Sequence, residues 1–196
     1  TPPVNNLERE LTAYVLNLSR NVVMESEIKE TDPTNEQQIN RQAHMMVMQP
    51  ASSINYVRFR HMGRTNKRYF NTTPIWSDLP DEDWRLPSEP NPLARYSFHF
   101  HKTGIDEEPH EAEGLVVQDN PGWGIVNHHS HAHVRDSITY RVLGSGFNTE
   151  AGDERGSFER CFALQSRGSG ETRPDSRSDI RHQGLGTGEI LEFGFQ

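Results

Sequence analysis

The sequence predicts a mainly β fold, an antiparallel β-sandwich or barrel preceded by two N-terminal helices. Three observations lead to this prediction. Apolar and polar residues alternate with a period of two in several short segments after residue 94. Turn signals such as Asp119-Asn120-Pro121-Gly122 separate these segments without intervening helical periodicity. Before residue 50, in contrast, apolar residues recur at helical spacing.

The two helices are expected over residues 5–30 and 34–50. Pro33 separates them, and Thr34 with Gln37 forms a capping-box pattern at the start of the second helix. A single apolar stripe runs along the first helix and consists of Leu7, Leu11, Val15, Leu18 and Val22. Because the connection between the helices is short, we expect them to pack as an antiparallel pair.

We divide the chain into three parts, and no internal repeat is visible in it. Residues 1–50 form the helical hairpin, residues 51–93 a basic hairpin followed by a proline-rich strap, and residues 94–196 the β domain. The strap contains prolines at closely spaced positions, which forbids long regular elements and favours an extended segment. These prolines are Pro74, Pro80, Pro87, Pro90 and Pro92.

Basic residues alternate with aromatic residues between residues 54 and 70. Such interleaving can bind nucleic acid through phosphate neutralisation and base stacking. The net charge of −8 argues against a polyanion partner. We therefore favour contacts with acidic groups, within the chain or on a protein partner, over nucleic acid. The residues concerned are Arg58, Arg60, Arg64, Lys67 and Arg68.

Histidines are concentrated in the β domain, at alternate positions of two segments, residues 96–102 and 127–133. On an extended strand, such histidines point to one face, about 6.5–7 Å apart. Neutral imidazole is the commonest metal ligand, and two histidine-bearing strands in one small domain indicate that their faces converge. The candidate ligands of a divalent metal are His131, His133, His129, His99, His101 and His182.

Residues 127–155 resemble the first metal-binding motif of the cupin family. The resemblance rests on His131-x-His133, Tyr140, Val142-Leu143-Gly144-x-Gly146 and Gly152-Asp153-Glu154-Arg155. Cupins are small β-barrels that hold iron, manganese or another divalent metal with histidines and a glutamate. The resemblance implies that His131 and His133 are ligands, and we expect their ring nitrogens to converge inside the β domain. Ser137 occupies the usual glutamate position, as in ring-cleaving cupin dioxygenases that use histidines only, and no second cupin motif is visible.

Composition points to burial of surface between subunits and limits the location of the protein. Only 32% of the residues are hydrophobic, and the mean hydropathy is −0.83. Either the core is thin, or surface is buried in a homo-oligomer or larger assembly. The single cysteine, Cys161, excludes an intrachain disulfide. No apolar run approaches the roughly 20 residues of a membrane span, and no signal peptide is visible. We expect a cytoplasmic protein or a component of a virion.

Two functions compete. The first is a metal-dependent cupin-like enzyme, such as a non-haem iron dioxygenase, that acts on a small organic substrate and uses iron, manganese or zinc. The second is a non-enzymatic structural protein of a virion or filament, with a jelly-roll or sandwich fold that interlocks with neighbouring subunits. The histidine pattern favours the enzyme, whereas low hydrophobicity and long irregular segments favour the assembly. We favour the enzyme slightly.

Overall fold

The computed structural model describes residues 14–27, 39–67 and 91–167, and all twelve regular elements in these residues are β-strands that pair in parallel. Sheet A consists of β1 (Val22–Glu25), β4 (Val57–Arg60), β7 (Val116–Asn120), β9 (Ile138–Val142) and β12 (Phe162–Leu164). Sheet B consists of β2 (Met45–Val47), β5 (Phe98–Gly104), the first part of β8 (Ile125–Arg135) and β10 (Phe147–Thr149). Sheet C consists of β3 (Ser53–Asn55), β6 (His110–Glu113), the second part of β8 and β11 (Arg155–Glu159).

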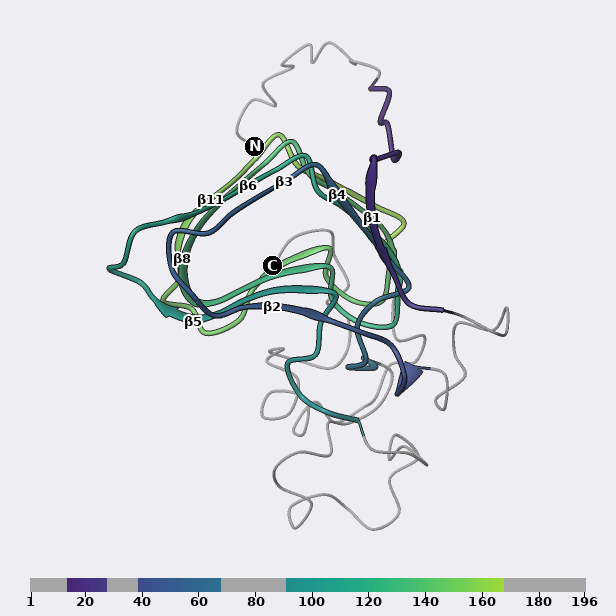
Figure 1. Cartoon of the computed structure of the whole chain (residues 1–196), viewed down its shortest axis with the longest axis horizontal. Helices are drawn as coiled ribbons and strands as arrows, with labels where there is room; N and C mark the ends of the chain where they lie inside the picture. The colour runs from purple at the N-terminus through teal and green to yellow at the C-terminus, as the bar shows by residue number, and fades with distance from the viewer. Residues whose placement is uncertain (1–13, 28–38, 68–90, 168–196) are drawn as a thin grey trace, which may run out of the picture.

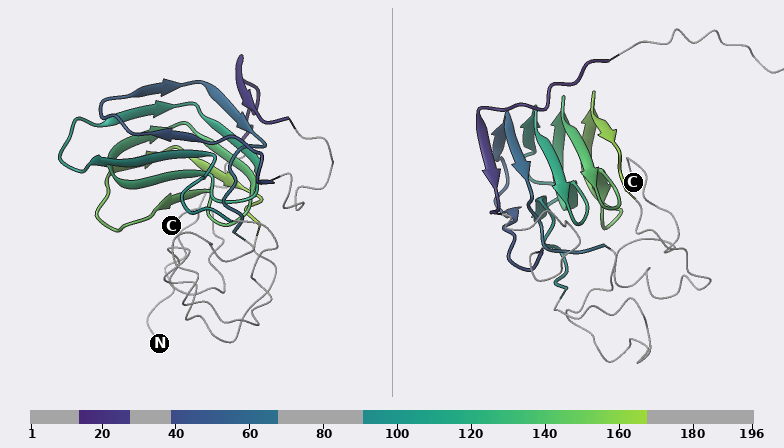
Figure 2. Two further views of the ribbon diagram at one scale, coloured as in Figure 1. Left: turned by 60° about the horizontal axis from the view of Figure 1, so that its bottom comes forward. Right: turned by 90° about the vertical axis from the view of Figure 1, so that its right-hand side faces the viewer.

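The chain passes through sheets A, B and C in turn, so the strands stack as the coils of a three-sided β-solenoid (Figure 1). The first coil contains β1, β2 and β3, the second β4, β5 and β6, the third β7 and β8, and the fourth β9, β10 and β11, after which β12 returns to sheet A. Figure 2 shows the strands of sheet A side by side, from β1 at one end of the solenoid to β12 at the other. Sheet A contains strands from all three parts into which we divided the sequence: β1 from residues 1–50, β4 from residues 51–93, and the other strands from residues 94–196.

The corners of the solenoid repeat from coil to coil because residues with left-handed backbone occupy equivalent positions. At the corner between sheets C and A these residues are Tyr56, Gly114, Asp136 and Arg160, with φ between 48° and 65°. At the corner between sheets A and B they are His61, Asp119, Arg141 and Gln165, with φ between 50° and 55°. Positive φ is uncommon for residues other than glycine. Its recurrence at stacked positions marks a structural repeat that the sequence does not display.

The predicted antiparallel sandwich or barrel, jelly-roll or cupin-like, is therefore wrong, although the mainly β composition is right. Alternation of apolar and polar residues has the same period in parallel and antiparallel strands. The turn signals do not reverse the chain but carry it around a corner. In one such corner, the Asn120 side chain donates hydrogen bonds to the carbonyl oxygens of Gly122 and Trp123, 3.1 and 2.8 Å away.

The two predicted N-terminal helices are also wrong where the structure describes them. Val22–Glu25 of the first forms β1, which pairs with β4, and Met45–Val47 of the second forms β2, which pairs with β5. Pairing with neighbouring strands outweighs the weak helical preference of these segments. Residues 5–13, 28–30 and 34–38 of the two predicted helices lie outside the described residues. Within the described residues, no helix is long and apolar enough to cross a membrane.

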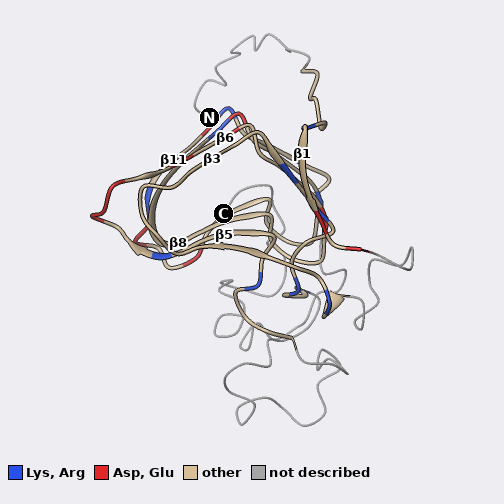
Figure 3. Cartoon of the chain, in the orientation of Figure 1, with Lys and Arg blue, Asp and Glu red and all other residues tan. Residues whose placement is uncertain are grey.

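Stacked apolar columns form the core inside the three sheets. Phe98, Ile125 and Phe147 pair in register across three strands of sheet B, and all three are fully buried. Sheets A and C supply matching columns that close the interior, and these contain Phe59, Val117, Ala112 and Val134. Charged residues lie outside this core, and Figure 3 shows acidic residues in the loop that joins β5 to β6.

The outer face of sheet B is covered as well. Leu93 to Ser97, which precede β5, lie beneath sheet B in Figure 1. Tyr96 and Trp123 stack there with ring centroids 5.0 Å apart, and together with Ala94 and Val126 they form a second buried cluster. This cover buries outward-facing polar side chains of sheet B, so it creates an environment in which a polar site can be held away from water.

Candidate metal centre

Three histidine side chains meet on the outer face of sheet B, His99 and His101 from β5 and His128 from β8. One ring nitrogen of each lies within 4.8 Å of the others, which is close enough to hold a metal ion. His99 is fully buried, whereas His101 and His128 are partly exposed. The cluster therefore has a buried side and a side that solvent or a small molecule can reach.

The hydrogen bond of His99 fixes its ring in the orientation of a metal ligand. Its Nδ1 lies 3.2 Å from the carbonyl oxygen of Ala94, which can only accept a hydrogen bond, so Nδ1 carries the proton. The lone pair of Nε2 then points into the cluster, 3.4 Å from Nδ1 of His101. Histidines that bind metals characteristically donate their other ring N–H to a carbonyl or carboxylate in this way.

A carboxylate completes the polar cluster. Oε2 of Glu150 lies 3.1 Å from Nδ1 of His128 and 3.5 Å from Nε2 of His99, and the Glu150 side chain is only 9% exposed. Its other oxygen, Oε1, accepts a hydrogen bond of 2.9 Å from the Tyr96 hydroxyl. Nζ of Lys67 lies 3.3 Å from the centroid of the Trp123 ring, next to this cluster.

The electrostatics of the cluster favour a cation. Burial, together with the neighbouring His101 and His128, lowers the pKa of His99 to about 4 although Glu150 opposes the shift. Burial opposes ionisation of Glu150, but its contacts with His128 and His99 and the charge of Lys67 lower its pKa to about 2. At neutral pH the cluster thus combines a neutral imidazole at His99 with an ionised carboxylate at Glu150, which are ligand forms that metals require.

Parallel stacking of coils brings these residues together. His101 pairs in register with His128 on the adjacent strand. Glu150 follows Thr149, which pairs with Asn127, so Glu150 stands beside His128 on the next coil. His99 lies two residues before His101 and therefore shares its outward face. Adjacent strands of successive coils are about 4.8 Å apart, so residues at the same register position can contribute ligands to one site.

The structure places the described members of the predicted ligand set at three locations: the cluster on sheet B, the outer face of sheet C and, for His129, the corner between sheets B and C. His99 and His101 belong to the cluster, as above. His131 and His133 lie in the sheet C part of β8, where the inward positions are Ser130, Ala132 and Val134, so the expected convergence of His131 and His133 inside the domain is wrong. Their own metal-binding role stays a prediction, and His182 lies outside the described residues.

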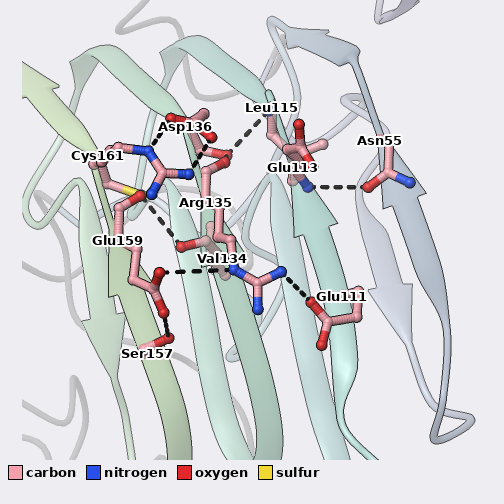
Figure 4. A network of polar contacts seen from close by, with 12 residues as sticks. Asn55, Glu111, Glu113, Leu115, Val134, Arg135, Asp136, Ser157, Glu159 and Cys161 are labelled. Carbon is pink, nitrogen blue, oxygen red and sulfur yellow. Dashed lines mark hydrogen bonds and ion pairs between the residues drawn. The ribbon is translucent and has the colours of Figure 1, made fainter.

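The surroundings of His131 and His133 consist of hydrogen bonds and ion pairs on the outer face of sheet C. Nδ1 of His131 lies 3.2 Å from the carbonyl oxygen of Glu107, and Nδ1 of His133 lies 2.9 Å from Oγ of Ser157. Figure 4 shows the adjacent network, in which Arg135 bridges Glu111 and Glu159. The two rings lie 5.2 Å apart, centroid to centroid, and neither histidine belongs to the cluster on sheet B.

His128 and Glu150 were not predicted as site residues because one residue reverses the alternation of β8. His129 has φ of 47° and occupies the corner between sheets B and C, where its ring pairs with Asp153. As a result, His128 faces outward from sheet B, whereas the residues that share its parity beyond the corner, Ser130 and Ala132, face the core. The sequence did contain one relevant signal, the second histidine-bearing segment that forms β5. Its register with β8, which places His101 beside His128, follows only from parallel pairing.

Arg58, Arg60 and Lys67 have side-chain contacts within the chain. Arg60 lies 3.4 Å from Glu25 and 3.9 Å from Asp119, as predicted for acidic contacts. Arg58 instead donates a hydrogen bond to the amide oxygen of Gln118, and Lys67 is buried against Trp123. Backbone N–H of Arg64 bonds to the carbonyl oxygen of Arg95, and Arg68 lies outside the described residues.

Comparison with known proteins gives no further guidance, since no family model, no curated protein and no solved structure matches the chain significantly.

Proposed function

We propose that the chain is a metal-dependent enzyme whose divalent cation is held by His99, His101 and His128. The observation that carries the proposal is the convergence of their three ring nitrogens within 4.8 Å. Three protein ligands with an accessible side are typical of catalytic metal sites, which keep a position for water or substrate. Structural sites, in contrast, are closed by four protein ligands.

The chemistry of such a centre is polarisation of an oxygen atom on a small organic substrate, or activation of a bound water. The partly exposed His101 and His128 mark the side from which a substrate would approach. Histidine ligands suit zinc and iron, and iron would extend the proposal to the dioxygenase activity that the cupin resemblance implies. Oxygen consumption by the iron-loaded protein would distinguish that reaction from metal-assisted hydrolysis.

Metal content is the test. Purified protein, dialysed against trace-metal buffer after loading with Zn²⁺, should retain about one ion per chain by elemental analysis. His101→Ala and His128→Ala should each lose most of it. The double variant His131→Ala/His133→Ala is the matched control, because it removes two histidines of the same strand β8 from the outer face of sheet C. Retention by the first two variants and loss in the control would contradict the proposal.

A structural role in an assembly is the second candidate, and the exposure of β1 favours it. β1 lies at the edge of sheet A, and its Val22, Val23 and Met24 are 56%, 45% and 39% exposed. An exposed apolar edge strand is a template for pairing with another chain. Light scattering of the wild type and of Val23→Lys tests this candidate, since a lysine on the edge should reduce any self-association.

A further inference from the structure

We propose that the metal centre has a fourth protein ligand, the carboxylate of Glu150, and that Tyr96 is the residue that positions it. This inference rests on the proposed three-histidine centre and adds an oxygen to its nitrogen ligands, so a position for water or substrate requires a five- or six-coordinate ion. The two residues come from different coils, since Tyr96 precedes β5 and Glu150 follows β10.

The distances around Oε2 of Glu150 are those between ligands of one ion. Metal–ligand bonds of about 2.0–2.1 Å place neighbouring ligand atoms about 2.8–3.0 Å apart in octahedral geometry and about 3.3–3.4 Å apart in tetrahedral geometry. Oε2 lies 3.1 Å from His128 Nδ1 and 3.5 Å from His99 Nε2, and His99 Nε2 lies 3.4 Å from His101 Nδ1. An ion bound by the histidines would therefore have the Glu150 oxygen within reach.

Oε2 of Glu150 and Nδ1 of His128 are both buried, and they face each other as an ion pair at 3.1 Å without a well-aligned hydrogen bond. Buried polar atoms nearly always have a partner, so each such atom calls for an explanation. The Glu150 side chain is only 9% exposed, and a carboxylate held this far from water needs strong partners. A shared cation satisfies both atoms at once.

Tyr96 holds the carboxylate in this orientation. Its hydroxyl donates a hydrogen bond to Oε1 of Glu150, so Oε2 remains directed at the histidine cluster. The phenol ring is fully buried, stacks on Trp123 and lies 5.2 Å from the His99 ring, so packing fixes its position. Hydrogen bonds to ligating carboxylates orient the ligand and contribute to metal affinity.

Titration of the metal-free full chain with Co²⁺ tests the inference, with affinity measured by calorimetry and ligand geometry by visible absorption. Tyr96→Phe removes only the hydroxyl, and we expect it to weaken Co²⁺ binding about 10- to 100-fold. Glu150→Gln should weaken it at least about 10-fold and shift the absorption bands, because a carboxylate leaves the coordination sphere. Circular dichroism and thermal melting verify that both variants are folded.

Matched controls come from other faces of the solenoid. Tyr140→Phe changes a tyrosine that packs against Arg141 on sheet A, and Glu159→Gln changes an exposed glutamate of sheet C. Both should bind Co²⁺ as the wild type does. Wild-type affinity and spectrum in Glu150→Gln, with binding lost in His101→Ala, would overturn the fourth ligand and leave the three-histidine centre intact.

Two other outcomes are equally decisive. Wild-type behaviour of Tyr96→Phe beside a weakened Glu150→Gln would overturn the positioning role of Tyr96 alone. Absence of Co²⁺ binding by the wild-type chain would overturn the proposed function and this inference together.

Discussion

His101 on β5 and His128 on β8 occupy the same register position of adjacent parallel strands, and their rings lie 5.0 Å apart, centroid to centroid. Twenty-seven positions separate them in the chain, since 128 − 101 = 27. Parallel stacking without an offset converts this separation into direct contact. The metal centre that we propose depends on this relationship, so it should be sensitive to changes at either residue.

Metal binding should stabilise the folded chain through these histidines. A ligand that binds only the native state at 100 times its Kd adds about 2.7 kcal/mol to the free energy of unfolding. We expect this increase for the wild type with Zn²⁺, measured by urea denaturation, and no increase for His128→Asn. His133→Asn should respond as the wild type does. Equal stabilisation of His128→Asn would contradict the assignment of His128 as a ligand.

Gly156→Ala should be strongly destabilising, by more than about 2 kcal/mol. Gly156 has φ of +117°, and a Cβ there would overlap the backbone carbonyl of Ala132 on the neighbouring strand β8. Gly152→Ala is the control, because Gly152 has φ of +88° but no atom within 4 Å of the added carbon. It should cost only the backbone strain, about 1 kcal/mol. Chemical denaturation measures the free energy of unfolding of both variants. Similar losses of stability would contradict the prediction, because they would show that the backbone at Gly156 can move to accommodate a Cβ.

Asp119→Asn should destabilise the protein by about 1.5 to 3 kcal/mol at pH 7. The Asp119 side chain is 10% exposed and pairs with Arg141 through Nε at 2.7 Å. Burial alone would raise the pKa of Asp119, but hydrogen bonds from Arg141 and Gln118 lower it below its ordinary 3.8. Asparagine tolerates the left-handed backbone at this position, so the effect reports the charge.

The pH dependence of that difference follows from the sign of the shift. A lowered pKa means that ionised Asp119 stabilises the folded state above about pH 4, and this contribution is lost as pH falls through the folded pKa. The difference in the free energy of unfolding between wild type and Asp119→Asn should therefore be constant from about pH 5 to 7 and become smaller below pH 4. Asp136→Asn, at an exposed left-handed position paired with Arg160, should show a smaller gap. A gap at Asp119 that does not change with pH would contradict the ion-pair account.

Purified protein should carry no nucleic acid that salt displaces. Arg60 is engaged with Glu25 and Asp119, and Lys67 is 3% exposed, so the basic segment offers few free charges to phosphates. The ratio of absorbance at 260 and 280 nm before and after a high-salt wash measures this. A salt-dependent affinity for nucleic acid that Arg58→Ala weakens would contradict the prediction.

The sequence predicted strands well because alternation is a local property. The alternating residues 96–102 overlap β5, and a further alternating run after residue 94 forms β9. Their faces were harder to predict. Ile138, Tyr140 and Val142 would share one side of an unbroken strand, but the left-handed Arg141 puts Val142 on the side of Thr139, which pairs with the core residue Val117.

Strand direction and the composition of the site could not be derived in the same way. The coils differ in length: Arg58 pairs with Val116 and Val116 pairs with Ile138, separations of 58 and 22 residues, since 116 − 58 = 58 and 138 − 116 = 22. Insertions between coils hide the repeat. The sequence identified His99 and His101, but Glu150 joins them only through the register of successive coils, which no local pattern encodes.

An anomalous difference map of Zn²⁺-soaked crystals, collected at the zinc absorption edge, tests the central claim most directly. We predict one strong peak between His99, His101 and His128, at about 2.0–2.2 Å from Nε2 of His99. No peak at this position, or a peak only between His131 and His133 on sheet C, would contradict the account.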